Sequence, residues 1–164
     1  MRTALASDES DALKSYDLVW LLHLTGDIHQ PLHCATRVTK TSKRGDAGGN
    51  SVVVDVAPND LHGYWDNLLG MGDTENYPVA VKAAQLLAAA DTSAASDIKE
   101  ADWANESFTL AKSNVYVDPP IGPGLGKFTM SSNPSYTADS LKIAQQRVAL
   151  AGTRLANVLN AELK

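Results

Sequence analysis

The sequence predicts an all-α protein, and three observations support this prediction. Apolar residues recur at intervals of three and four along several long segments, as expected for amphipathic helices. A single short run, residues 51–56, is β-branched enough to suggest a strand. Proline and glycine gather in a few connections between the helical segments. The 164 residues, 44% apolar and 20% charged, suit one globular domain, so we expect a single helical domain over residues 1–164.

The first predicted helix begins at Ser7 or Asp8 and runs to about Gln30. Its apolar residues recur at helical spacing: Leu13, Tyr16, Leu18, Trp20, Leu21 and Leu24. Pro31 lacks a backbone donor and should end or kink this helix. Residues 36–50 are polar and rich in turn-forming residues, which predicts a long exposed loop.

The second part of the chain should be mainly helical. The run "SVVVDV" at 51–56 is the expected strand, and Asn59 or Asp60 can cap a helix that ends near residue 69. Further helices are predicted over residues 78–90 and 96–116. A Pro/Gly-rich connection, residues 117–135, is the second long loop, and a helix over residues 135–163 closes the chain.

The last predicted helix carries a stripe of apolar residues. We expect this stripe to be buried against the first helix, with Ala151 and Gly152 allowing close approach; it comprises Leu141, Ile143, Val148, Leu150, Leu155 and Val158.

Charge and composition exclude several classes of protein. The net charge of −5 leaves no basic surface for gripping a phosphate backbone, so a bound polyanion would need another positive group, such as a metal ion. Cys34 is the only cysteine, so no internal disulfide can form and the redox compartment stays undecided. No apolar run reaches the ~18 residues of a membrane span. The polar first residues do not resemble a signal peptide.

Three of the four histidines fall in the stretch "HLTGDIHQPLH". His23 and Asp27 are four residues apart, as are His62 and Asp66, so each pair shares one face of a helix. His33 lies beyond Pro31, where the chain can turn back toward the same cleft. A single histidine on an apolar helix is more often a core residue, but two matched pairs favour a metal site.

The ligand types indicate zinc, which binds imidazole nitrogen and carboxylate oxygen. Without cysteine ligands, an open hydrolytic site is favoured over a closed structural one. His29 points away from His23 around the helix and is interpreted as a core residue. The sequence contains no G-x-S-x-G motif, and "GDAGGN" lacks the Lys-Ser/Thr of a phosphate-binding loop.

The segments "HLTGDIHQPLH", "GGN" and "LHGYWDNLLG" together resemble the zinc-dependent, single-strand-specific nucleases of the S1/P1 type. Members of that family are also 3′-nucleotidases and are distantly related to bacterial zinc phospholipase C. The segments "WANESFTLAKSNVY" and "AGTRLANVLN" resemble the last two helices of the family, so the likeness extends from about Leu18 to Asn160.

The resemblance implies a helical fold with three zinc ions in a cleft, where a zinc-activated water attacks phosphorus. It implies that His23 and Asp27 bind the first zinc and that Asp27, as a catalytic residue, also reaches the third. His33, His62 and Asp66 would complete the protein ligands of the second zinc. The implied partner is single-stranded nucleic acid or a nucleotide, and the implied location is secreted or periplasmic.

Two asparagines are implied to lie beside this cleft. Asn50 and Asn67 would contact the nucleotide, and a local turn or capping role is the alternative for each.

The sequence also departs from the family pattern. The family has an N-terminal Trp that binds zinc through its amino group, followed by further His and Asp ligands, and we find none of these before the motif helix. The chain therefore corresponds to the C-terminal two-thirds of the family and offers one complete set of protein ligands. This predicts low activity for these 164 residues, and an exposed apolar surface that favours a homo-oligomer or a missing N-terminal segment.

Two alternatives to the nuclease stay open from the sequence. One is a non-catalytic, zinc-binding helical module, for which about one zinc per chain would be expected. The other is a phospholipase C-like zinc hydrolase, which activity on phosphatidylcholine would distinguish.

Overall fold

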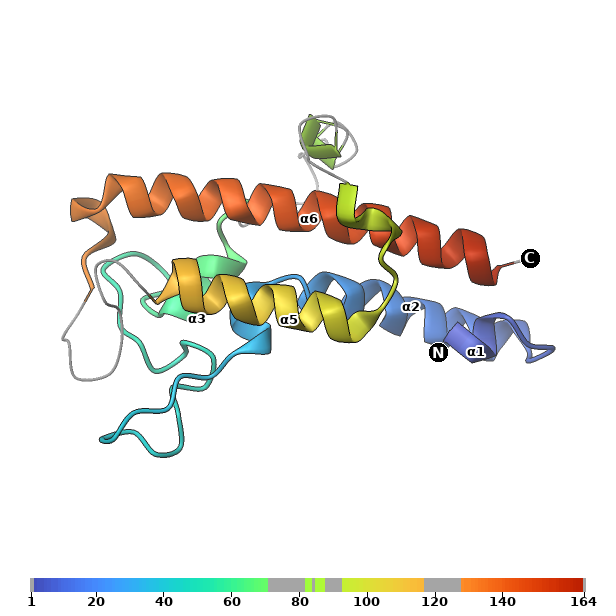
Figure 1. The fold of residues 1–164 in the computed structure, drawn as a ribbon, viewed down its shortest axis with the longest axis horizontal. Coiled ribbons are helices and arrows are strands. Elements are labelled where there is room, and N and C mark those ends of the chain that lie inside the picture. The colour runs from blue at the N-terminus through green and yellow to red at the C-terminus, as the bar shows by residue number, and fades with distance from the viewer. Residues whose placement is uncertain (1, 71–81, 84, 88–92, 117–127, 164) are drawn as a thin grey trace.

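A computed structural model describes residues 2–70, 82–83, 85–87, 93–116 and 128–163. Within these ranges all named elements are helical, so the all-α prediction is confirmed. Figure 1 shows the long helix α6 (Pro134–Glu162) running along the molecule beside α2 (Asp11–Asp27) and α5 (Glu100–Leu110). Helix α6 contacts α2 directly. None of the helices in the described ranges is both long enough and apolar enough to cross a membrane.

The first helix begins later than the sequence predicts. Helix α2 begins at Asp11 because Ser10 caps it, accepting a hydrogen bond from the Leu13 backbone N–H. A short helix that was not predicted, α1 (Arg2–Leu5), precedes it. The Arg2 guanidinium pairs with Glu162 at 2.9 Å and with Glu100 at 3.1 Å. These ion pairs connect the start of the chain to α5 and α6.

The chain leaves α2 just before Pro31. Helix α2 ends at Asp27, residues 28–30 form a turn, and a 3-10 helix, η1 (Pro31–Cys34), follows with Pro31 at its first position. Proline suits that position because the first residues of a helix have no partner for their N–H groups. The predicted break is therefore present, and it redirects the chain between Asp27 and His33.

The strand predicted over residues 51–56 is wrong. This segment makes only isolated bridges, Val53 with Asp60 and Val54 with Phe128. The chain doubles back almost at once, since the Asn59 N–H donates to the Val56 carbonyl. Val52 and Val54 are nevertheless buried, at 2% and 0% exposed. The β-branched residues therefore fill a core and do not build a sheet.

The next elements occur in the predicted order but begin or end at other residues than predicted. Helix α3 (Leu61–Asp66) is capped by Asp60, which accepts from the Gly63 N–H, and is shorter than predicted. Most of the predicted helix 78–90 lies outside the described residues, although 82–83 and 85–87 are helical. Two further 3-10 helices are η2 (Ser93–Ser96) and η4 (Met130–Ser132).

The predicted helix 96–116 and the long loop after it are only partly as expected. The predicted helix comprises the last residue of η2, then α5 from Glu100, then the π-helical turn η3 (Ala111–Val115). Of the loop predicted over residues 117–135, the part 117–127 lies outside the described residues, and α6 begins at Pro134. Residues 36–50 form turns and bends.

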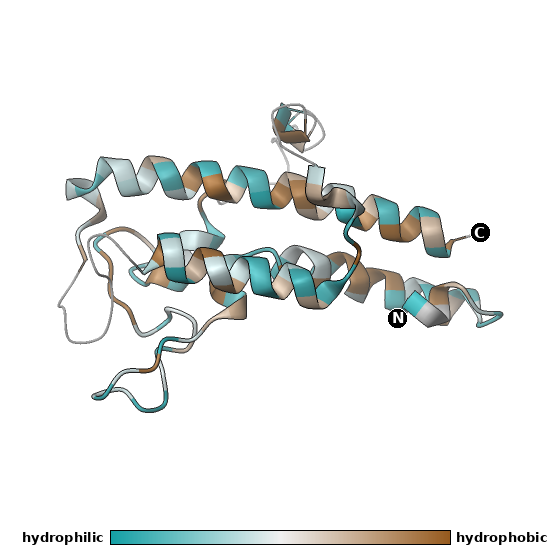
Figure 2. Ribbon diagram, in the orientation of Figure 1, coloured by the Kyte–Doolittle hydropathy of each residue, from teal (hydrophilic) through white to brown (hydrophobic). Residues whose placement is uncertain are grey.

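Helix α6 buries the predicted stripe only in part. Leu150 and Val158 are buried as expected, and Ile143 and Leu155 are half-buried against the core clusters, but Leu141 and Val148 are exposed, at 36% and 49%. Gly152 is also exposed and approaches no other element. Figure 2 shows apolar residues recurring along α6 between polar ones. The buried positions on this helix that were not predicted include two arginines: Tyr136, Ser140, Arg147, Ala149 and Arg154.

Helix α2 leaves an apolar face exposed. We use "the α2 apolar face" for Leu13, Tyr16, Trp20 and Leu24, which lie on one side of the helix and are 40–60% exposed. Of the apolar residues predicted along this helix, Leu21 is buried and Leu18 packs partly against the cluster around Trp103. The helical period was therefore correct, but most of the stripe has no cover from the described residues.

Candidate metal centre

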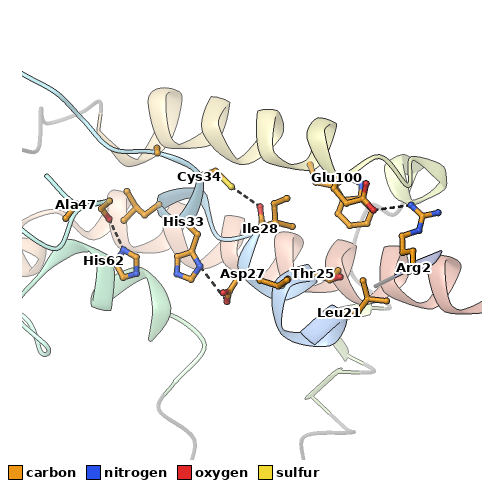
Figure 3. A pocket seen from close by; sticks show the side chains of 15 residues that line it. Arg2, Leu21, Thr25, Asp27, Ile28, His33, Cys34, Ala47, His62 and Glu100 are labelled. Carbon is orange, nitrogen blue, oxygen red and sulfur yellow. Dashed lines mark hydrogen bonds and ion pairs between the residues drawn. The ribbon is translucent and has the colours of Figure 1, made fainter. Parts of the chain in front are cut away.

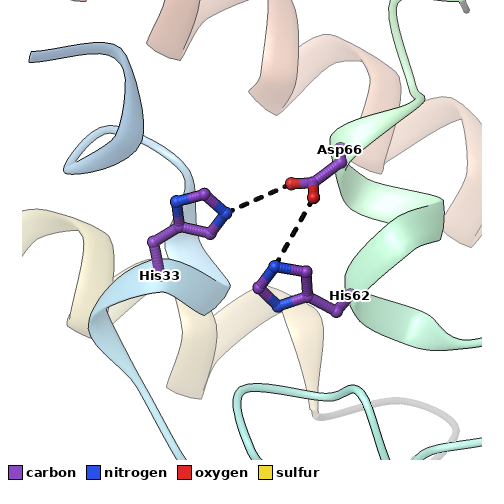
Figure 4. Close-up of side chains that lie close together, drawn as sticks. All are labelled: His33, His62 and Asp66. Carbon is purple, nitrogen blue, oxygen red and sulfur yellow. Dashed lines mark ion pairs between the residues drawn. The ribbon is translucent and has the colours of Figure 1, made fainter. Parts of the chain in front are cut away.

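Three side chains from two elements converge on one point. His33 comes from η1, and His62 and Asp66 come from one face of α3. His33 Nε2 lies 3.3 Å from Asp66 Oδ1, and His62 Nε2 lies 3.5 Å from Asp66 Oδ2. Figure 4 shows both rings turned toward the carboxylate. The two imidazole rings stack with centroids 4.9 Å apart.

This donor set fits a zinc ion. Nitrogen and oxygen atoms bound to tetrahedral zinc at about 2.1 Å lie roughly 3.4 Å apart from one another. The two nitrogen–oxygen distances of 3.3 and 3.5 Å match that spacing. The three candidate ligand atoms all lie within 4.8 Å of one another. Two imidazoles and one carboxylate leave at least one coordination position open, as in hydrolytic zinc sites.

The His62 ring is held in one orientation by the glycine-rich loop. Its Nδ1 atom donates to the Gly48 carbonyl oxygen at 2.8 Å, which leaves Nε2 free to bind a metal. Gly48 has φ +64°, and a Cβ at this position would lie 2.7 Å from the Leu32 carbonyl oxygen. Asp46, fully buried, fixes the same loop by accepting from the Arg37 N–H and the Thr36 hydroxyl. The loop thus acts as an outer support of the centre.

The second histidine–aspartate pair lies next to this group. His23 Nε2 is 3.1 Å from Asp27 Oδ2, and Asp27 Oδ1 is 3.6 Å from His33 Nδ1. The five sequence-predicted ligands therefore form one continuous series, with Asp27 between the two histidines. His23 is 62% exposed, so this end of the series is open to solvent.

Two cavities meet at the ligands. A cavity of about 940 Å³ extends from His33 and His62 along α2 to Arg2 and Glu100, as Figure 3 shows. A second cavity, of about 460 Å³, is lined by His23 and Asp66 as well as by Asp27, His33 and His62. The ligand atoms are therefore accessible to a solute.

His29 does not belong to the metal group. Its ring is 1% exposed, with Nδ1 donating to the Thr25 carbonyl oxygen at 2.7 Å and Nε2 accepting from Arg154 at 3.0 Å. Burial lowers the pKa of His29 to about 4, so the ring is neutral at pH 7. Both nitrogens are occupied, which confirms the interpretation of His29 as a core residue.

The two asparagines make local hydrogen bonds. The Asn50 amide donates to the Ala47 carbonyl oxygen and the Asn67 amide to the Gly63 carbonyl oxygen, each at 2.7 Å. Neither residue lines the two cavities at the ligands. A residue that sequence reasoning missed is Gln30, whose amide donates to Asp66 Oδ1 at 2.8 Å. No periodicity signals this contact, because the two residues are far apart in sequence.

The sequence matches the S1/P1 nuclease family over residues 1–164. The chain belongs to the S1/P1 nuclease family. Among curated proteins, "Endonuclease 4" of Arabidopsis thaliana is 30% identical over 98% of this chain and 56% of its own length. "Endonuclease 5" of the same plant is 30% identical over 94% of this chain and 55% of its own length. "Endonuclease 3" of the same plant is 27% identical over 94% of this chain and 55% of its own length.

The chain spans about half the length of these curated relatives. Within that half lie the candidate metal ligands His33, His62 and Asp66 and the adjoining pair of His23 and Asp27.

Proposed function

We propose that the chain forms part of a zinc-dependent phosphodiester hydrolase that cleaves single-stranded nucleic acid and removes the phosphate of 3′-nucleotides. The observation that carries the proposal is the convergence of His33, His62 and Asp66 at two open cavities in a chain of the S1/P1 nuclease family. The endonuclease names of the relatives support the same substrate class.

In this proposal His33, His62 and Asp66 hold one zinc ion, and His23 and Asp27 hold part of the coordination sphere of another. A bound zinc ion would supply Lewis acidity, lowering the pKa of a water molecule and offsetting the negative charge of the phosphate. Asp27 is the proposed catalytic carboxylate, since it lies between His23 and His33. The metal also explains how a chain with net charge −5 can bind a polyanion.

Substrate contacts by Asn50 and Asn67 are part of the proposal. Each amide would have to release its present bond, to the Ala47 or Gly63 carbonyl oxygen, before it could contact a nucleotide.

Further ligands for the zinc ion at His23 and Asp27 are proposed to come from outside these 164 residues. His23 and Asp27 lie at the end of the α2 apolar face, where an additional segment or a second copy of the chain would find apolar surface to cover. Sedimentation velocity with and without zinc distinguishes the two sources, because only a second copy doubles the mass. A monomer in both conditions favours an additional segment.

The test is a zinc-supplemented, single-turnover assay with protein in excess over labelled substrate. The substrates are single-stranded DNA, a 3′-nucleotide and phosphatidylcholine vesicles. We expect slow cleavage of the first two, abolished in Asp27→Asn and Asp66→Asn and unchanged in Asp139→Asn, an exposed carboxylate on α6. Cleavage of the vesicles alone would indicate a phospholipase. Zinc binding with no hydrolysis of any substrate, both by this chain and by a fusion that supplies the further ligands, would indicate a non-catalytic module and overturn the proposal.

A further inference from the structure

The turn that joins α2 to η1 is held by side chains from two other helices. Ser107 of α5 donates its hydroxyl to the Ile28 carbonyl oxygen at 2.6 Å. Arg147 of α6 donates from Nε to the His29 carbonyl oxygen at 3.1 Å. These carbonyls lie just beyond the end of α2, where backbone acceptors lose their partners within the helix. The two side chains supply those partners.

Arg147 makes further hydrogen bonds that hold it in this position. Besides the His29 carbonyl, it donates from Nη1 to Glu106 at 2.7 Å and from Nη2 to the Ser107 hydroxyl at 2.8 Å. The residue is only 8% exposed. Each of its three guanidinium nitrogens donates to another residue of the protein, although Arg147 also lines the cavity beside His33 and Asp66.

Arg154 completes the same network about two turns further along α6. It pairs with both carboxylate oxygens of Glu106, each at 2.7 Å, and contacts the His29 ring. Arg154 is fully buried. A buried charge is costly unless its partners are well placed, so this network fixes α5, α6 and the turn 28–30 in one arrangement.

The turn 28–30 sets the distance between two candidate ligands. Asp27 is the last residue of α2, and His33 lies in η1 immediately after the turn. The 3.6 Å separation of Asp27 Oδ1 and His33 Nδ1 and the 3.3 Å separation of His33 Nε2 and Asp66 Oδ1 both depend on the path of this turn. A small displacement of the turn would move His33 away from α3.

We propose that Arg147, together with Ser107, is a positioning residue of the metal centre. Arg147 holds the His29 carbonyl and Ser107 holds the Ile28 carbonyl, so that His33 reaches both Asp66 and Asp27. This inference rests on the proposed function, because it requires that His33 and Asp66 bind zinc.

The test compares Arg147→Lys and Ser107→Ala with the matched control Val158→Ala. Lysine keeps the positive charge but cannot donate in three fixed directions as guanidinium does. Val158 lies on α6 about three turns beyond Arg147, is 1% exposed and belongs to the cluster around Trp103. Ile28 of the turn also packs against this cluster, but the Val158 side chain donates no hydrogen bond to the turn, so the control separates lost packing from lost hydrogen bonds. The measurements are zinc affinity by competition with a chelator, the visible absorption of the Co²⁺-substituted protein, and the urea midpoint without metal.

We expect Arg147→Lys and Ser107→Ala to weaken zinc binding about 10- to 100-fold, as loss of an outer support of a ligand does, and to alter the Co²⁺ spectrum. Val158→Ala should lower the urea midpoint and leave both metal readouts unchanged. If Arg147→Lys does not fold, Ser107→Ala decides the question.

Two results would overturn the inference in distinguishable ways. Unchanged zinc affinity and Co²⁺ spectra in the folded variants would show that the network is purely structural, while leaving the proposed function intact. A wild-type chain without Asp66-dependent zinc binding would remove the proposed function and the inference together.

Discussion

At the scale of single residues, Gly48 combines a left-handed backbone with a hydrogen bond to His62, one of the candidate metal ligands. Its φ of +64° lies in the left-handed region, and its carbonyl oxygen orients His62. We expect Gly48→Ala to destabilise the protein by at least about 1–2 kcal/mol, the cost of a left-handed non-glycine residue. We also expect it to weaken zinc binding about 10- to 100-fold. Urea denaturation and chelator competition measure the two effects.

Gly152 provides the matched glycine for comparison. It lies in α6 with nothing within 4 Å of an added Cβ. Alanine favours a helix over glycine by about 0.5–1 kcal/mol, so Gly152→Ala should raise stability by that amount and leave zinc affinity unchanged. Loss of zinc affinity in Gly152→Ala would show that the assay reports general perturbation, and Gly48→Ala would then carry no evidence about His62.

The residues that form the candidate site differ in how well the sequence alone predicts their contacts. The four-residue spacing of His23 with Asp27 and of His62 with Asp66 is a local property of helices, so these pairs could be predicted. Gln30 and Arg147 could not, because their contacts with Asp66 and with the His29 carbonyl join segments that are distant in sequence. Only the folded chain places them together.

At the scale of elements, two valines on α6 allow a test of which face of this helix is buried. Val158 is 1% exposed and Val148 is 49% exposed, although both were predicted to lie on the buried stripe. Val158→Asp should destabilise the protein by more than about 3 kcal/mol, because it buries an unpaired charge. Val148→Asp should change stability by less than about 0.5 kcal/mol. Equal urea midpoints for the two variants, followed by circular dichroism, would contradict the observed orientation of α6.

Apolar periodicity located the helices but not every buried face. It placed α6 within one residue at its start, because proline and serine there favour a helix beginning. It missed the face of α6 that carries Arg147 and Arg154, since charged residues are normally exposed and these two are buried with Glu106 and with backbone carbonyls as partners. The β-branched run 51–56 misled for a similar reason: burial in a core requires the same residue types as a strand.

At the scale of the whole molecule, Glu106 makes the free energy of unfolding depend on pH in the acid range. Hydrogen bonds from Arg154, followed by those from Arg147, lower the pKa of Glu106 to about 2 from 4.5. A lowered carboxyl pKa stabilises the fold fully above pH 4.5, and this contribution is lost as pH falls toward 2. Because Glu106 is 34% exposed, we reduce the expected contribution for solvent screening to about 2 kcal/mol.

The corresponding experiment measures unfolding free energy against pH in the presence of a chelator, for wild type and Glu106→Gln. The variant should be less stable at pH 7 and should lose less stability than wild type between pH 4.5 and 2. Parallel curves over that range would show that Glu106 does not couple the network to pH.

The central claim is that the fold assembles a zinc site from His33, His62 and Asp66. Zinc bound per chain, measured by elemental analysis after dialysis against zinc-buffered solution, tests it most directly in wild type, Asp66→Asn and the control Asp139→Asn. We predict about one tightly bound zinc in wild type and in Asp139→Asn, and its loss in Asp66→Asn, because removing a carboxylate ligand breaks the set. Equal zinc content in Asp66→Asn and Asp139→Asn would contradict the account.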